Sequence, residues 1–110
     1  MGERKVDLLQ GTLDLIVLRL LRAGPATGWE LTQSIQTISR GVLDVNYGSI
    51  YPALRRLEAQ DWVTARWAPS ANNRRARFYQ LTAAGRRQLA AEREEWARFS
   101  RALGLILGAE

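Results

Sequence analysis

The chain has 110 residues, a length that suits one domain with a single hydrophobic core and is too short for two. It contains no cysteine and no histidine, which excludes disulfides and thiolate metal sites and removes the commonest general base. The net charge is +5, the N-terminus lacks a signal-peptide pattern, and no apolar run approaches the ~20 residues that cross a bilayer. We therefore expect a cytoplasmic protein that is not an enzyme, with no metal, no cofactor and no membrane partner.

The first half of the chain predicts two helices. Apolar residues recur at helical spacing through LLQGTLDLIVLRLLRAGPA, and Gly24-Pro25 ends this first helix. Thr27 is placed to cap a second helix from Gly28 to about Ile38, with Glu30 as its capping-box partner. The apolar residues of the second helix that we expect to face the core are Leu31, Ile35 and Ile38.

A third helix follows the break at Arg40-Gly41 and a possible short strand from Val42 to Val45. We expect it to begin between Asn46 and Ser49, both good caps, and close to Pro52, which is tolerated in a first turn. At 100° per residue the buried stripe is Ile50, Leu54 and Leu57. The opposite face carries Gly48, Pro52, Arg55 and Ala59, flanked by Tyr51 and Arg56.

The rest of the chain predicts a β-hairpin and a long last helix. The strands are expected at Trp62 to Trp67 and Arg77 to Leu81, joined by the turn-forming, arginine-bearing segment PSANNRR. Thr82 is placed to cap a helix from Ala83 to about Leu107. Its coiled-coil-like apolar stripe is Leu89, Trp96, Phe99, Leu103 and Ile106. This stripe either packs back onto its own domain or pairs with a second subunit.

The positive charge is concentrated on the third helix and the hairpin. Residues 46–80 carry six arginines against Glu58 and Asp61, a net charge of +4, whereas residues 1–45 are neutral and residues 81–110 carry +1. A helix followed by a hairpin with a basic tip is the layout of a winged helix-turn-helix, which suits double-stranded DNA. We expect a mainly α fold with a small β-hairpin, in which residues 1–82 are a winged-helix DNA-binding domain and residues 83–110 are a dimerisation helix.

Five segments resemble the PadR family of bacterial transcriptional regulators. They are LLQGTLDLIVLRLL, PATGWEL, GSIYPALRRLEAQ, WVTARW and RRARFYQLTAAGRRQL, which together span Leu8 to roughly Trp96. The resemblance implies a winged-helix domain, a homodimer built through the last helix, and repression from a pseudo-palindromic operator. With one helix after the wing, the chain is similar to the short branch of the family. Asp61 departs from the family, which commonly has glycine there, although aspartate tolerates the left-handed turn.

The expected DNA contacts come from the N-terminal arm, the third helix and the wing: Lys5, Ser49, Tyr51, Pro52, Arg55, Arg56, Arg74, Arg75 and Arg77. Tyr51 could equally pack against the second helix, and the direction of Arg77 stays open. The resemblance gives Trp96 two readings, a core residue of the dimer seam or a platform that stacks a planar aromatic effector. The main alternative function is a winged-helix adaptor that binds a protein partner without specific DNA binding.

Overall fold

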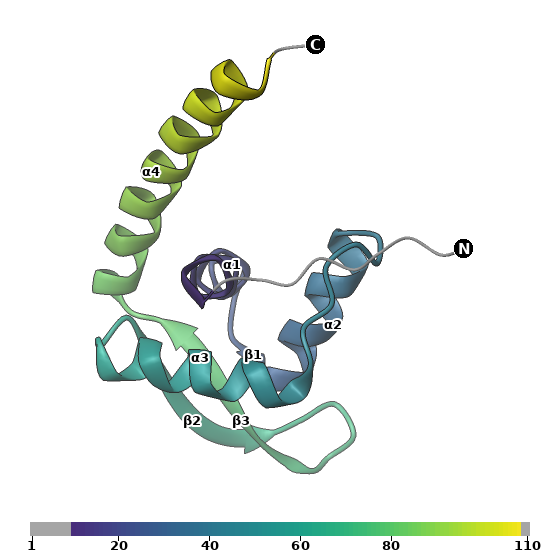
Figure 1. Ribbon diagram of the computed structural model, residues 1–110. Helices are drawn as coiled ribbons and strands as arrows, with labels where there is room; N and C mark the ends of the chain where they lie inside the picture. The colour runs from purple at the N-terminus through teal and green to yellow at the C-terminus, as the bar shows by residue number, and fades with distance from the viewer. Residues whose placement is uncertain (1–9, 109–110) are drawn as a thin grey trace.

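The structure is a computed structural model that describes residues 10–108 (Figure 1). Its elements in chain order are α1 (Gln10–Leu21), β1 (Ala26–Thr27), α2 (Gly28–Ile38), α3 (Tyr47–Ala59), β2 (Val63–Pro69), β3 (Arg75–Leu81) and α4 (Ala83–Leu107). This arrangement confirms the expected fold class, a mainly α winged helix with a small sheet. The residues before Gln10 that were expected to belong to the first helix and to the N-terminal arm, including Lys5, lie outside the described residues.

The sheet has three antiparallel strands in the order β1-β3-β2. The β2–β3 hairpin is the wing, and its register runs from Val63 opposite Leu81 to Pro69 opposite Arg75. The wing is longer than predicted because pairing continues to Pro69, whose missing N–H is tolerated at the end of an edge strand. The sequence did not reveal β1, because two residues are too short for a period-two pattern to be visible.

The core lies where α1, α2 and α3 meet the base of the wing. The predicted stripe of α3 is confirmed, since Ile50, Leu54 and Leu57 are fully buried. Ile38 was wrongly assigned to the core: it is 69% exposed because it is the last residue of α2 and extends past the neighbouring helices. The other buried apolar residues are Leu13, Val17, Leu18, Leu21, Leu31, Ile35, Val45, Ala53, Val63, Tyr79, Leu81 and Leu89.

Side-chain caps fix the starts of three helices at the predicted residues. Thr27 and Glu30 form the reciprocal capping box of α2, in which each backbone N–H donates to the other side chain at 2.9 and 3.1 Å. Asn46 accepts from the Ser49 N–H at 2.9 Å and starts α3. Thr82 likewise accepts from the Gly85 N–H at 2.9 Å and starts α4.

Two expectations next to α3 need correction. Because Asn46 caps the helix, Pro52 lies in the helix interior and not near its start. A proline there has no N–H for the helical ladder, and its ring would crowd the carbonyl one turn earlier. The structure also shows no strand from Val42 to Val45, where Leu43 forms only an isolated bridge.

The end of α3, the base of the wing and the start of α4 form one tight joint. Asp61 takes the left-handed conformation with φ of 62°, as expected for the residue that closes α3. The Thr82 hydroxyl donates to the Asp61 carbonyl at 2.7 Å, and the Thr82 N–H donates to the Trp62 carbonyl at 3.0 Å. Gly85 packs so closely on the Trp62 carbonyl oxygen that a Cβ atom would collide with it. The first turn of α4 is therefore fixed to the end of α3.

From this joint α4 runs past α1 and projects beyond the rest of the molecule (Figure 1). Its last buried residue is Leu89, and every residue from Phe99 to Gly108 is exposed. Among the described residues, no helix is long and apolar enough to cross a membrane.

Candidate nucleic-acid interface

The outward face of α3 presents a small polar residue, a proline and a cation. Ser49 and Arg55 are exposed and Pro52 is half-buried. The Ser49 hydroxyl donates to the amide oxygen of Asn46 at 3.3 Å, which fixes it at the first turn. Within the described part of the chain, no carboxylate pairs with Arg55. The guanidinium is therefore available to a ligand outside the protomer.

Tyr51 lies at the contact between α3 and α2. A Cβ atom on Gly28, the first residue of α2, would stand 3.2 Å from the Tyr51 ring and from its hydroxyl. Tyr51 therefore packs against the start of α2, one of the two readings that the sequence left open. Its side chain is still 36% exposed.

Arg56 faces α1 instead of the outward face of α3. Its Nη2 donates to Asp14 Oδ1 at 2.8 Å and its Nε donates to Oδ2 at 3.3 Å. The hydrogen bond to Asp14 is the main reason why the pKa of Arg56 is raised. Such a bidentate pair holds the guanidinium plane in place. Arg56 thus braces α3 against α1, which leaves Arg55 as the more available cation of this helix.

The wing tip is an ordered loop of residues 70–74. The Ser70 N–H donates to the Arg74 carbonyl at 2.7 Å, and the Asn73 N–H donates to the Ser70 carbonyl at 2.9 Å. Asn73 takes the left-handed conformation that this turn requires, with φ of 64°. Arg74 is exposed at the tip, and the described residues offer it no carboxylate. Arg75 lies over the Trp67 ring, its Cζ 5.7 Å from the ring centroid.

Arg77 connects the wing to α3. Its Nη2 donates to Glu58 Oε2 at 3.0 Å, and its Cζ lies 5.9 Å from the centroid of the Tyr79 ring. Tyr79 is buried beneath it, and burial raises the pKa of the phenol, while the positive charge of Arg77 acts in the opposite direction. The open direction of Arg77 is thereby resolved: it points to α3 and fixes how the wing is oriented against that helix.

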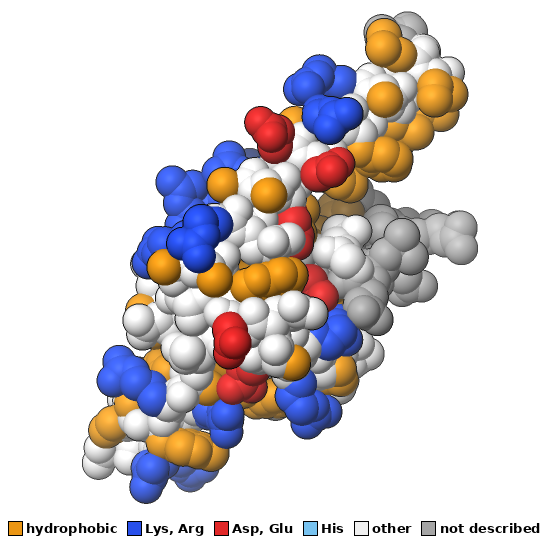
Figure 2. All heavy atoms as spheres, turned by 90° about the vertical axis from the view of Figure 1, so that its left-hand side faces the viewer, with side chains coloured by type: hydrophobic (Ala, Val, Ile, Leu, Met, Phe, Trp, Pro, Cys, Tyr) orange, Lys and Arg blue, Asp and Glu red, His pale blue; other side chains and the backbone are white. Residues whose placement is uncertain are grey.

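The structure separates the nine expected DNA-contact residues into groups. Ser49, Pro52 and Arg55 share the outer face of α3, and Arg74 and Arg75 lie at the wing tip. Tyr51 packs against the start of α2, Arg56 and Arg77 hold ion pairs within the chain, and Lys5 is not among the described residues. Arg66 is a further exposed cation of the wing and was not among the expected contact residues. Figure 2 shows cationic side chains at the wing end of the molecule.

The projecting part of α4 carries an apolar surface at the other end (Figure 2). Trp96, Phe99 and Ile106 are 50%, 54% and 80% exposed, and the Trp96 and Phe99 ring centroids are 5.6 Å apart. Leu89 does not fit the predicted dimer stripe, because it is only 3% exposed and packs in the core of its own chain. The available stripe therefore starts at Trp96.

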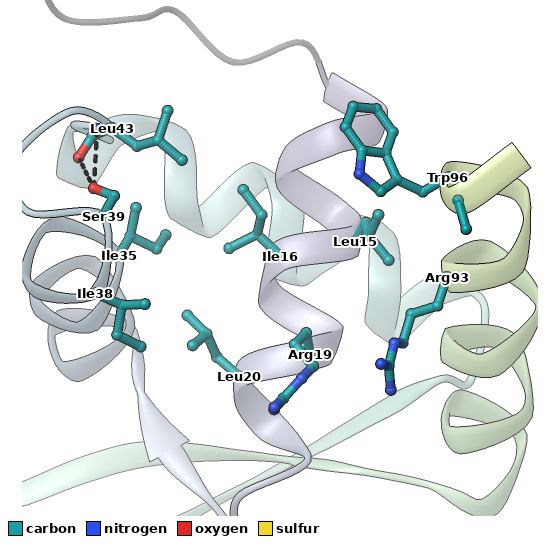
Figure 3. Close-up of a pocket in the computed structure, with 11 residues that line it drawn as sticks. Leu15, Ile16, Arg19, Leu20, Ile35, Ile38, Ser39, Leu43, Arg93 and Trp96 are labelled. Atoms are coloured by element: carbon teal, nitrogen blue, oxygen red, sulfur yellow. Dashed lines mark hydrogen bonds between the residues drawn. The ribbon is translucent and has the colours of Figure 1, made fainter. Parts of the chain in front are cut away.

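An apolar pocket of about 500 Å³ lies between α1, α2 and α4 (Figure 3). Ile16 and Ile38 are among its apolar lining residues, and Trp96 projects from α4 toward α1 at one edge. Arg19 and Arg93 are its charged members, and no carboxylate pairs with either within residues 10–108. In the same part of the chain, no group of three aspartate, glutamate, cysteine or histidine residues could hold a metal ion.

A helix-turn-helix with a basic wing and an exposed arginine on its third helix is the layout of a winged-helix DNA-binding domain. The chain belongs to the transcriptional regulator PadR-like family, whose family model matches residues 17–91. The family resemblance noted in the sequence is therefore confirmed. A family of transcriptional regulators also supports the prediction that the chain is not an enzyme.

Two solved structures share the fold over most of the chain, and a further protein resembles it in sequence. A transcriptional regulator from Clostridium thermocellum is 22% identical with a TM-score of 0.84, over 96% of this chain and 100% of that one. A PadR family transcriptional regulator from Eggerthella lenta is 28% identical with a TM-score of 0.77, over 92% of this chain and 86% of that one. An uncharacterised protein from Lysinibacillus sphaericus is 25% identical over 92% of this chain and 93% of its own length.

Proposed function

We propose that this regulator binds a pseudo-palindromic DNA operator as a homodimer and represses transcription from it, in the cytoplasm. The observation that carries the proposal is the joint exposure of Arg55 on α3 and Arg74 at the wing tip, neither paired with a carboxylate among the described residues. Leaving cations unpaired on two neighbouring elements favours a polyanionic partner. Repression is inferred from the family resemblance.

In this proposal α3 enters the major groove, where Arg55 contacts a guanine edge or a phosphate. Ser49 and Pro52 lie on the same face as Arg55 and complete the contact, and the exposed part of Tyr51 flanks that face. A bidentate arginine–guanine contact contributes about 1–3 kcal/mol of discrimination. Arg56 and Arg77 support the contact indirectly, because their ion pairs with Asp14 and Glu58 orient α3 and the wing.

The proposed dimer forms through the projecting end of α4. Trp96, Phe99, Leu103 and Ile106 lie within one face of the helix, and each is more than a third exposed. Contiguous exposed apolar residues on a soluble domain mark an interaction surface. A second copy supplies a matching stripe, because a two-fold interface uses the same surface twice.

A binding titration tests the proposal. The probe is a fluorescein-labelled duplex from upstream of the protein's own gene, and its fluorescence anisotropy should rise when the protein binds. The two half-sites should lie about one helical turn apart, or ~10.5 base pairs. Arg55→Ala should weaken binding about 10-fold or more, since it removes a base or phosphate contact. Arg87→Ala, an exposed arginine on α4, is the control. If the unmodified protein, Arg55→Ala and Arg87→Ala bound with equal affinity, the proposed contact between α3 and the DNA would be contradicted.

The pocket beside Trp96 supports effector binding as a second function. It has an apolar lining with Trp96 at one edge, which suits a planar aromatic compound, and Arg19 and Arg93 suit an acidic group on that compound. Binding there would change how α4 sits on α1 and hence the separation of the two recognition helices. Trp96→Ala should abolish saturable quenching of tryptophan fluorescence by aromatic acids, and quenching that persists would rule out Trp96 as the platform.

The adaptor alternative predicts a different outcome. A winged-helix adaptor would retain a protein partner from a nuclease-treated lysate and would leave the labelled duplex unbound. The unpaired Arg55 and Arg74 favour DNA over that alternative.

A further inference from the structure

A groove with aromatic walls separates the wing from the N-terminal ends of α2 and α3. It has a volume of about 540 Å³, and Trp29 of α2, Tyr51 of α3, and Trp67 and Arg75 of the wing line it. Figure 1 shows the wing loop lying beyond the start of α3, on the side where α2 also begins. Neither Trp29 nor Trp67 is among the expected DNA-contact residues, so the proposed function does not yet account for them.

The wing wall of the groove is a continuation of the core face of the hairpin. Residues that share one face of the hairpin alternate along each strand, and at the base of the wing this face holds the buried Val63 and Tyr79. Toward the tip the same face presents Trp67 and Arg75, which no longer have a core to cover them. The groove therefore lies where this face of the hairpin changes from buried to exposed.

Trp29 and Trp67 are both 57% exposed, an unusual state for the largest apolar side chain. Trp67 is held by its strand and by the guanidinium of Arg75 over its ring. Trp29 is held in the first turn of α2, which the Thr27–Glu30 capping box fixes. Two half-exposed indoles on opposite walls, each carried by a backbone segment held in regular structure, form a binding surface that needs little backbone reordering on binding.

We propose that this groove holds one sugar-phosphate strand of the bound DNA, with Trp29 and Trp67 packed against its deoxyribose rings. The inference rests on the proposed function. When α3 lies in the major groove and the wing tip lies in the adjacent minor groove, the strand that separates the two grooves has to pass between α3 and the wing. The groove occupies that position, and its two walls come from the elements on either side of the strand.

The charges in the groove set the orientation of the strand. Arg75 lies on the wing wall, whereas Glu30 lies on the α2 wall with its Oε1 accepting the Thr27 N–H. A phosphate is attracted to the first and repelled by the second. The phosphates therefore face Arg75, and the apolar sugar edge faces the indoles.

Acrylamide quenching of tryptophan fluorescence, with and without the labelled upstream duplex, tests the inference. The unmodified protein should show lower acrylamide accessibility when DNA is bound, because Trp29 and Trp67 become covered. In the Trp29→Phe/Trp67→Phe variant, which keeps aromatic side chains at both positions, that decrease should disappear. If accessibility of the unmodified protein is the same with and without bound DNA, the inference is overturned. If no DNA binds at all, the proposed function fails and the inference fails with it.

Affinity measurements give an independent readout. Trp29→Ser should weaken DNA binding about 10-fold while leaving the slope of log K against log salt unchanged, since an apolar contact releases no counterion. Val42→Ser, which also removes an exposed apolar side chain, is the control and should bind like the unmodified protein. A folded Trp29→Ser protein that binds within about 2-fold of the unmodified one would contradict the apolar contact.

Discussion

Gly85 lies where α4 is attached to the end of α3. Its Cα lies against the Trp62 carbonyl, and the hydrogen bond from the Thr82 N–H to that carbonyl is adjacent. Gly85→Ala should lower the free energy of unfolding by about 1–3 kcal/mol, because the backbone must shift to admit a methyl group. Urea unfolding followed by circular dichroism measures this effect.

Gly104→Ala is the matched control within the same helix. A Cβ atom at Gly104 meets no atom within 4 Å, so the change should raise the free energy of unfolding by up to about 1 kcal/mol through helix propensity. Equal effects of the two substitutions would show that the close approach of Gly85 to Trp62 carries no cost.

Tyr79 gives the protein a sensitivity to alkaline pH. Burial raises its pKa above the ordinary value of 10.0, against the opposing charge of Arg77. The folded state therefore keeps the phenol proton at a pH where the unfolded chain releases it. Stability should be fully present below about pH 10 and fall as the pH rises through the folded-state pKa.

Urea midpoints at about pH 8 and about pH 11 test this titration. The unmodified protein should lose more stability between the two values than Tyr79→Phe, which retains the ring and lacks the ionisable hydroxyl. Parallel losses in the two proteins would assign the alkaline transition to other groups.

At the scale of the elements, the wing should supply a defined part of the electrostatic binding energy. Arg74→Ala and Arg75→Ala should each reduce the slope of log K against log salt by about 1, because each removes one phosphate contact. Arg87→Ala on α4 should leave the slope unchanged. Titrations by fluorescence anisotropy from low to moderate salt measure the slopes. Unchanged slopes in both wing variants would remove the wing tip from the DNA contact.

Local signals in the sequence were sufficient to predict most of these elements. The caps at Thr27, Asn46 and Thr82 and the buried stripe of α3 follow from neighbouring residues, because a cap reaches three positions and a helical stripe repeats every three or four. β1 depends on its pairing with β3 in the folded protein. The interior position of Pro52 depends on whether Asn46 or Ser49 caps the helix. Neither is visible in a local pattern.

The site was less predictable because its contacts join distant positions. The sequence placed the expected contacts on α3 and the wing because of their arginines, and Arg55, Arg74 and Arg75 are indeed exposed on these elements. It could not show that Arg56 pairs with Asp14, which lies 42 positions away, or that Arg77 pairs with Glu58. The groove between Trp29, Tyr51 and Trp67 draws on three elements, so it exists only in the folded chain.

For the whole molecule, the prediction concerns assembly. Ile106→Asp should convert the proposed dimer to a monomer, because a carboxylate in the apolar stripe would be buried without a partner. It should also weaken DNA binding at least ~100-fold, since two half-sites are then bound independently. Sedimentation at micromolar concentration and anisotropy titration measure the two effects.

The control for assembly is Leu105→Asp. Leu105 is as exposed as Ile106 but lies off the stripe, about 140° around the helix from its centre. It should leave the dimer intact. A stable folded monomer of the unmodified protein would contradict the dimer itself. If both Ile106→Asp and Leu105→Asp abolished the dimer, the interface would include more of the surface of α4 than the stripe.

The tight joint at Asp61, Trp62 and Thr82 makes α4 a lever. With 25 residues α4 is about 37 Å long, so a tilt of about 5° at its base moves its tip by about 3 Å. The base of α4 is hydrogen-bonded to the end of α3, the helix that carries the exposed Arg55. A tilt of α4 would therefore also tilt α3. A displacement of the tip of α4 would in this way rotate α3, and no part of the chain between the two helices has to unfold.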